Sequence, residues 1–317
     1  MNPNPLPSCS VVIPVYNSEL TLEMLVERLA QVLPGVTTNY EVILVNDCSP
    51  DRSWEIICKL SQQFPWIRGI NLMRNYGQHN ALLCGIRAAR NEVTITMDDD
   101  LQHPPEEIHK LVEKLQEGYD VVYGSPQKMP HSLWRNFFSW LSKRVLAFVM
   151  GIKTVRELSA FRAFRTHLRN AFQDYQSPGV IIDALLSWGT TRFASVPVNE
   201  EPRSLGRSNY GFSKLASQVL LILTGFSTVP LRAASWLGFT FMIVGMVVFL
   251  YVVLAYFTLG SIPGFPFLAS IISLFSGSQL FTLGIFGEYL ARIFDRSMDR
   301  PPYVIGEAIE NGIEVKP

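Results

Sequence analysis

Short runs of β-branched and other apolar residues alternate with amphipathic helical patterns over residues 9–124. In the first helical segment apolar residues recur every three or four positions, as at Leu22, Leu25 and Leu29. The apolar runs predict strands at 10–15, 41–45, 69–72, 93–97 and 120–123. Strands that alternate with helices build βαβ units, so we expect an α/β fold with a mainly parallel sheet.

Polar residues gather where the predicted strands end. Tyr16 and Asn17 follow the first strand, the segment 46–49 closes the second, and Asp98, Asp99 and Asp100 follow the fourth. In open parallel sheets ligands bind at the carboxyl ends of the strands, because the loops of neighbouring strands meet there. The three clusters therefore predict one binding cleft.

An uncharged stretch runs from Ala233 to Gly287 and indicates a membrane part. A Gly- and Pro-containing break at 260–266 divides it, which predicts two spans near 234–259 and 267–290. The alternative is a buried helical hairpin in a soluble core, but the first span is apolar on every helical face.

Basic residues flank both predicted spans and none lies in the short loop between them, so both termini are expected in the cytoplasm. They are Arg203, Arg207, Lys214 and Arg232 before the first span, and Arg292, Arg296 and Arg300 after the second. No cleavable signal peptide is recognised at the N-terminus. The four cysteines form no C-x-x-C pair and are expected to be reduced thiols.

Two further segments have amphipathic helical patterns. Residues 133–150 place aromatic residues on one face and basic residues off it, and residues 208–232 lead towards the first span. Such helices lie in a membrane interface or pack on their own domain, and the pattern alone does not separate the two. Their apolar faces also permit a homo-oligomer, a dimer or a tetramer.

Charge and motif content exclude several classes of protein. The chain has 317 residues with 27 Lys and Arg against 27 Asp and Glu, so there is no basic excess for a nucleic acid partner. Neither the phosphate-binding pattern G-x-x-x-x-G-K-[ST] nor the dinucleotide pattern G-x-G-x-x-G occurs. A P-loop ATPase and a dinucleotide oxidoreductase are therefore not supported.

The aspartate triplet suits a divalent cation. Mg²⁺ and Mn²⁺ prefer oxygen ligands, and Mg²⁺ is commonly held by one or two carboxylates together with substrate phosphates. Because Asp98, Asp99 and Asp100 follow a buried strand, their carboxylates are expected in the cleft. The alternative is a solvated acidic turn.

Four segments resemble the family 2 glycosyltransferases, whose GT-A fold is Rossmann-like. They are 12–17 (VIPVYN), 45–51 (VNDCSPD), 74–77 (RNYG) and 97–106 (MDDDLQHPPE). The nearest subgroup is the bacterial polyprenyl-phosphate glycosyltransferases, related to dolichol-phosphate mannose synthase, which also carry two C-terminal spans. Segments that match this subgroup are 161–165, 196–198, 203–210, 228–232 and 284–290, so the resemblance covers about residues 9–305.

The resemblance implies a donor site for a nucleotide sugar, with Mg²⁺ or Mn²⁺ as cofactor. Asp98 is expected near the ribose and diphosphate, and Asp100 on the metal. The donor residues it implies are Pro14, Tyr16, Asp47, Arg74, Asp98 and Asp99. Alternative roles are a strand end for Pro14, packing for Tyr16 and a helix cap for Asp47.

The resemblance also implies an acceptor site for a lipid phosphate. Arg203, Arg207 and Ser208 match a segment that lies near the acceptor phosphate in the family, and their alternative role is juxtamembrane positive charge. Glu157 stands where many relatives have an aspartate proposed as the base, so it is either catalytic or a surface acid. Asn46 likewise replaces an aspartate of the family pattern.

The resemblance implies an inverting, metal-dependent transfer of one sugar to undecaprenyl phosphate, from a donor that is expected to be UDP-linked. The protein is expected in the inner membrane, with its catalytic domain in the cytoplasm. The predicted parts are a catalytic domain at 1–207, a juxtamembrane helix at 208–232, the spans within 233–290 and a tail at 291–317. Alternatives are a processive polysaccharide synthase, disfavoured because a Q-x-x-R-W motif is absent, and a non-catalytic sugar-nucleotide sensor.

Overall fold

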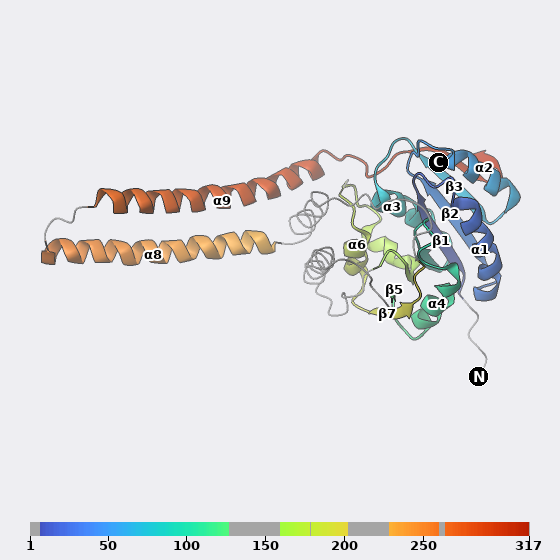
Figure 1. The fold of residues 1–317 in the computed structure, drawn as a ribbon, viewed down its shortest axis with the longest axis horizontal. Helices are drawn as coiled ribbons and strands as arrows, with labels where there is room; N and C mark the ends of the chain where they lie inside the picture. Colours follow the sequence, from blue (N-terminus) through green and yellow to red (C-terminus); the bar gives the residue numbers. More distant parts are fainter. Residues whose placement is uncertain (1–6, 127–158, 178, 202–227, 260–263, 317) are drawn as a thin grey trace. The chain divides into compact units, whose positions relative to one another are not determined.

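The computed structural model describes residues 7–126, 159–177, 179–201, 228–259 and 264–316. The chain divides into two compact units (Figure 1). Residues 1–216 and 299–317 form the first unit, and residues 217–298 form the second. The C-terminal residues thus return to the unit in which the chain begins.

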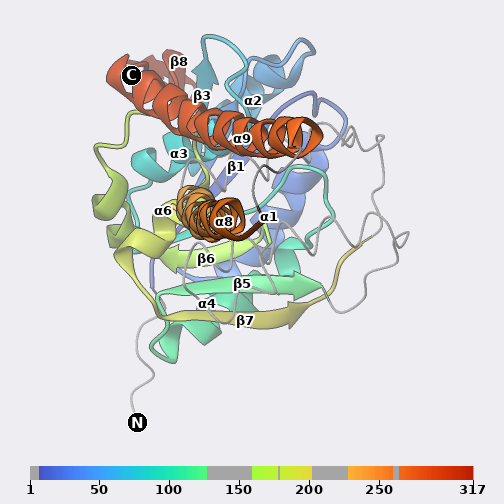
Figure 2. The ribbon, with the colours of Figure 1, turned by 90° about the vertical axis from the view of Figure 1, so that its left-hand side faces the viewer.

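The first unit is built on a mixed sheet with the order β7-β5-β6-β4-β1-β2-β3-β8-β9 among the described residues (Figure 2). Its strands are β1 (Cys9–Val15), β2 (Tyr40–Asn46), β3 (Ile67–Leu72), β4 (Val93–Thr96), β5 (Val121–Pro126), β6 (Arg162–Arg165), β7 (Phe193–Val198), β8 (Ile305–Glu310) and β9 (Ile313–Val315). The five predicted strands correspond to β1–β5.

The sheet is parallel only in part, which corrects the expectation of a mainly parallel sheet. β4, β1, β2 and β3 run parallel, as βαβ units require. In contrast, β6 is antiparallel to both β4 and β5, and β8 is antiparallel to β3. These antiparallel strands come from outside the βαβ series, from chain segments that lie far along the sequence from their partners.

Helices cover both faces of this sheet (Figure 1). Contacts place α1 (Leu22–Val36), α2 (Ser53–Gln63) and α4 (Ile108–Gln116) on one face, and α3 (Gln78–Ala88) with α6 (Ile182–Gly189) on the other. α1 packs through the apolar positions that its sequence period predicts, and Leu22, Leu25 and Leu29 are fully buried.

Close packing of α3 on the sheet requires a glycine. A Cβ atom at Gly85 would lie 2.3 Å from a methyl carbon of Val12 on β1 and 3.1 Å from one of Val45 on β2. No side chain fits at that separation, so the absence of a Cβ lets the helix approach the strands directly. This contact fixes α3, whose first residues lie at the carboxyl edge of the sheet.

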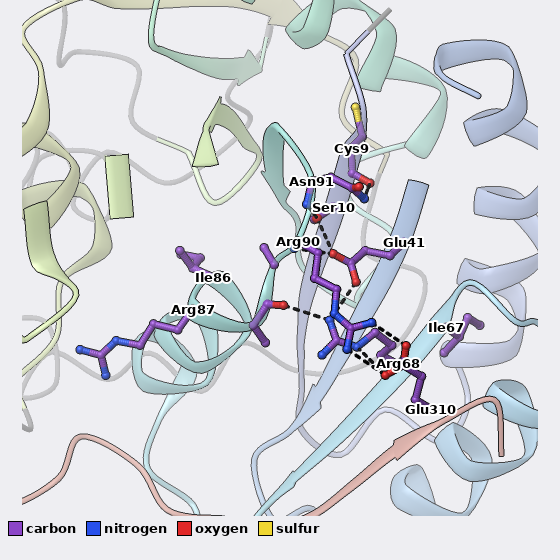
Figure 3. Close-up of polar contacts among 12 residues, drawn as sticks. Cys9, Ser10, Glu41, Ile67, Arg68, Ile86, Arg87, Arg90, Asn91 and Glu310 are labelled. Atoms are coloured by element: carbon purple, nitrogen blue, oxygen red, sulfur yellow. Dashed lines mark hydrogen bonds and ion pairs between the residues drawn. The ribbon is translucent and has the colours of Figure 1, made fainter. Parts of the chain in front are cut away.

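A C-terminal hairpin of β8 and β9 extends the sheet beside β3. Both guanidinium Nη atoms of Arg90 donate to Glu310, at 2.6 and 3.0 Å, and Arg68 donates to Glu41 at 2.8 Å (Figure 3). Part of the segment predicted as a tail therefore belongs to the sheet of the first unit. The ion pairs lie at the start of the parallel strands, on the edge opposite the predicted cleft.

The second unit contains two long helices, α8 (Val229–Leu259) and α9 (Phe265–Ser297), which coincide with the two predicted spans. Within the described residues, Val229–Ala255 alone has the length and composition of a membrane-spanning helix, and its most apolar 18 residues have a mean hydropathy of 2.6. None of its most apolar window is buried in the protein, unlike the core helix of a soluble domain. The second span stays a prediction.

The interfacial helices predicted at 133–150 and 208–232 lie outside the described residues, apart from the start of α8.

Candidate active site

A cavity of about 250 Å³ opens at the carboxyl edge of β1, β2 and β4, where the sequence predicts a binding cleft. The predicted donor residues, apart from Arg74, line this cavity. Its lining consists of Pro14, Val15, Tyr16, Asp47, Asn75, Gly77, Gln78, Asp98, Asp99 and Asp100. The register explains this convergence, because Val15 lies opposite Asn46, and Val12 lies opposite Thr96.

Asp47 organises the wall of the cavity that follows β3. Its Oδ1 accepts a hydrogen bond from the Tyr76 amide at 2.7 Å, and its Oδ2 accepts one from the Gly77 amide at 2.8 Å. Burial raises the pKa of Asp47, and these two amide donors oppose the rise. Gly77 has a φ of +93°, a conformation that favours glycine. The carboxylate therefore shapes the loop, and it does not cap α2, which begins at Ser53.

Arg74 lies beside the cavity rather than in its lining. Its guanidinium carbon stands 4.6 Å from the centre of the Tyr76 ring, an arrangement in which the cation faces the aromatic π system. Arg74 is exposed, and the loop that carries it is held by Asp47. The structure thus brings Arg74 to the rim of the predicted donor site.

Asp99 ties the loop after β4 to the loop after β1. Its Oδ2 accepts hydrogen bonds from the Ser18 hydroxyl and from the Tyr16 amide, the latter at 3.3 Å. Burial raises the pKa of Asp99 to about 6, and the hydrogen bonds from Ser18 and Tyr16 oppose the rise. Sequence reasoning grouped Asp99 with the donor ligands, and the structure adds this bond to the β1 loop.

Asp98 and Asp100 line the same cavity, and each accepts a hydrogen bond from a nearby amide group. Oδ1 of Asp98 accepts from the Gln78 side chain at 2.6 Å, and Oδ1 of Asp100 accepts from the Gln102 amide at 3.1 Å. Among the described residues no group of three or more His, Cys, Asp or Glu side chains forms a closed metal site. Two carboxylates in an open cavity match an Mg²⁺ or Mn²⁺ ion that completes its coordination with substrate oxygens.

The predicted acceptor residues Glu157, Arg203, Arg207 and Ser208 lie outside the described residues. Ser159 and Glu201 are the described residues nearest to these positions, and each contacts the loop after the aspartate triplet. Ser159 Oγ lies 3.3 Å from His103 Nε2, and the Glu201 amide donates to the Gln102 carbonyl at 2.9 Å. Ser159 and Glu201 therefore lie beside the loop that carries Asp100.

A buried polar network behind the cavity was not anticipated from the sequence. Arg162 is 2% exposed, donates to Thr96 on β4 at 3.0 Å and pairs with Asp183 on α6. The Tyr123 hydroxyl donates to the same Asp183 oxygen at 2.9 Å. The Phe161-Arg162 pair of the family motif was the sequence signal for this network. It could not identify the partners of Arg162, because they lie on three other elements. The network ties β6 and α6 to the end of β4, next to the aspartate triplet.

Comparisons with known proteins agree with this architecture. The profile described as "Glycosyl transferase family 2" matches residues 10–175. An uncharacterized glycosyltransferase of Synechocystis sp. is 33% identical over 300 residues, 94% of each chain. An undecaprenyl-phosphate 4-deoxy-4-formamido-L-arabinose transferase of Shewanella sediminis is 34% identical over 305 residues, 95% of this chain and 92% of that one.

Among solved structures, the fold resembles glucosyl-3-phosphoglycerate synthase from Mycobacterium tuberculosis in complex with Mn²⁺, UDP and phosphoglyceric acid. The TM-score is 0.52 at 18% identity, over 69% of this chain and 76% of that one. At this identity the likeness concerns the fold alone. With the family profile, the full-length relatives and this fold in agreement, the chain belongs to glycosyl transferase family 2 and is a glycosyltransferase of the GT-A fold.

Proposed function

We propose that the protein transfers a single sugar from a UDP-linked donor to undecaprenyl phosphate at the cytoplasmic face of the membrane. The observation that carries this proposal is the cavity at the strand ends that contains Asp98, Asp99 and Asp100. The Shewanella sediminis relative, which is named for a transfer to undecaprenyl phosphate, matches nearly the whole chain and supports the lipid acceptor. The apolar, unburied helix α8 supports a membrane location.

On the donor side, the loops after β1, β2 and β3 are expected to hold the nucleotide sugar. Pro14, Tyr16 and Asp47 are expected around the base, with Arg74 beside them. Asp98 is expected at the ribose and diphosphate, and Asp100 is the expected metal ligand. Fold neighbours solved with Mn²⁺ or Mg²⁺ and UDP support this assignment. A bound divalent metal neutralises the charge that develops on the departing nucleoside diphosphate.

On the acceptor side, the nucleophile is a phosphate oxygen. A phosphate monoester has its second pKa near 6, so it is largely a dianion at pH 7 and needs no deprotonation. Arg203, Arg207 and Ser208 are expected to bind this phosphate, because guanidinium groups pair with it bidentately. Glu157 is expected to orient the phosphate or to act as a base. In-line attack on the anomeric carbon inverts its configuration.

The proposal is tested with the full-length protein in detergent, Mn²⁺ or Mg²⁺, undecaprenyl phosphate and a panel of sugar nucleotides. We expect one donor to give a glycosylated lipid and free nucleoside diphosphate, and we expect EDTA to stop both. Asp100→Asn should lower turnover roughly a hundredfold or more, because it removes a charged metal ligand. The matched control is Asp174→Asn, which changes an exposed carboxylate and should retain activity.

A protein that binds a sugar nucleotide but makes no lipid product with any donor would contradict the proposal and favour the sensor. A product that carries many sugars on one lipid would instead favour the processive synthase. Equal activity of Asp100→Asn and Asp174→Asn would contradict the metal role.

A further inference from the structure

Each carboxylate of the aspartate triplet has a different hydrogen-bonding partner. Asp99 accepts from the β1 loop, through Ser18 and Tyr16, and Asp100 accepts from the Gln102 amide within its own turn. Asp98 also has a side-chain partner on another element, and this partner is an amide rather than a hydroxyl. Oδ1 of Asp98 accepts from Nε2 of Gln78 at 2.6 Å. This contact crosses from the loop after β4 to the first residue of α3.

The contact lies in the cavity and not in the core. Gln78 and Asp98 both line the cavity, Gln78 is exposed, and Asp98 is half-buried. A hydrogen bond that water can replace contributes little to folding. α3 is held on the sheet by its buried face, including the close approach at Gly85, so it does not need Gln78 for its position.

The chemistry of a glutamine suits a role in orienting a carboxylate. The amide N–H of Gln78 is a neutral donor, so this contact orients the Asp98 carboxylate without adding a compensating charge. A lysine or arginine at this position would compensate the charge, and a glutamate would repel it. Gln78 also lies next to Gly77, which Asp47 holds, so its own backbone is positioned by the same wall of the cavity.

We propose that Gln78 is a positioning residue that orients Asp98 towards the nucleoside diphosphate part of the donor, and that it thereby sets donor affinity. This inference rests on the proposed function, in which Asp98 contacts the donor. It requires that changes at Gln78 act on the donor and leave the lipid acceptor unaffected. It also requires that they act through Asp98.

The test compares Gln78→Leu and the nearly isosteric Gln78→Glu with the control Gln31→Leu, which changes an exposed glutamine on α1. Binding of UDP with Mn²⁺ is measured by calorimetry without lipid, and the KM of each substrate is measured in the transfer assay. Loss of one hydrogen bond to a charged group predicts a rise of roughly tenfold in donor KM and in the Kd for UDP. The lipid KM should stay within about twofold, which a general loss of structure would not allow.

A double-mutant cycle tests the route through Asp98. If Gln78 acts by orienting Asp98, then Gln78→Leu should have little further effect on UDP binding in an Asp98→Asn background. Equal Kd values for UDP in Gln78→Leu, Gln78→Glu and Gln31→Leu would overturn the inference, as would effects of Gln78→Leu and Asp98→Asn that simply add. If the proposed function itself is wrong, the wild-type protein will bind no UDP or form no glycosylated lipid. That result differs from a failure of the Gln78 inference, in which the wild-type protein is active.

Discussion

At the scale of single residues, the site is held together by carboxylates that bind backbone amides. Asp47 satisfies two amides of the loop after β3, and Asp99 reaches the Tyr16 amide of the loop after β1. A buried N–H group without a partner is costly, so each of these side chains stabilises one loop conformation. The walls of the cavity are therefore formed by loops that lie far apart in the sequence, and side-chain hydrogen bonds join these loops.

Asp47→Asn tests this role. An amide side chain has one acceptor oxygen, so it can satisfy only one of the two N–H groups of Tyr76 and Gly77 and turns a donor towards the other. We expect the free energy of unfolding to fall by about 1–3 kcal/mol, together with a higher donor KM. Chemical unfolding and donor kinetics measure the two effects. If Asp47→Asn matched the exposed-site control Asp174→Asn in both, the assigned role would be wrong.

Because of His79, we expect the stability of the folded protein to depend on pH. Burial lowers the pKa of His79 from 6.5 to about 4, the charge of Arg162 lowers it further, and the charge of Asp183 opposes the change. Between pH 6.5 and about pH 4 the unfolded chain carries a proton on His79, whereas the folded chain does not. Stability from this residue is therefore complete above pH 6.5 and declines as pH falls towards 4.

The measurement compares wild type with His79→Gln, which does not titrate. From pH 7 to pH 5 the wild type should lose about 2 kcal/mol more stability than the variant. Unfolding midpoints in detergent at the two pH values give this difference. Parallel losses in both proteins would show that His79 is not the titrating group.

At the scale of elements, the packing of α3 on the sheet decides where the cavity wall stands. Gly85 allows the close approach, since an added Cβ would overlap Val12, whereas a Cβ at Gly35 on α1 would meet nothing within 4 Å. The two glycines therefore form a matched pair. They share a helical setting and differ in the space beside them.

Gly85→Ala should destabilise the protein by about 1–3 kcal/mol and raise the donor KM, because α3 must shift from the sheet. Gly35→Ala should stabilise it by about 0.5–1 kcal/mol, since alanine favours a helix over glycine. Thermal unfolding of the two variants and donor kinetics provide the check. Equal stability changes in the two variants would exclude the packing argument.

The elements also show what the sequence does and does not predict. β1–β4 follow from local patterns, because apolar runs and helical periods alternate and βαβ connections allow one handedness. β8 was missed because it contains two glutamates and pairs with β3 from more than two hundred residues away. Its register depends on partners such as Gly69, where a Cβ would lie 2.7 Å from Ile309. No local pattern contains that information.

The residues of the candidate site likewise include some that the sequence predicts and some that it does not. Positions that end buried strands, such as Asp98 and Asp47, were predicted, because the sheet edge brings them together. Gln78 was not predicted, because its proposed role depends on its distance to Asp98 across the cavity. The network around Arg162 was also missed, because its partners Thr96, Tyr123 and Asp183 come from three separate elements.

At the scale of the whole molecule, the proposed lipid acceptor requires a membrane protein. Val229–Ala255 is long enough to span a bilayer and exposes its apolar side chains. The protein should stay in the membrane pellet after extraction at alkaline pH, which releases proteins bound only at the surface, and detergent should dissolve it. Release into the alkaline supernatant would contradict the assignment of α8 as a span.

The proposed acceptor is a lipid phosphate rather than a water-soluble one. Solved proteins of the same fold include one in complex with the water-soluble phosphoglyceric acid, whereas a full-length relative is named for undecaprenyl phosphate. The most direct measurement offers both phosphates to the purified protein with a sugar nucleotide labelled in the sugar, followed by extraction into organic solvent. We predict that label enters the organic phase only when undecaprenyl phosphate is present and that EDTA prevents it. Label transferred to 3-phosphoglycerate in the aqueous phase, with none in the lipid, would contradict the assignment of undecaprenyl phosphate as the acceptor.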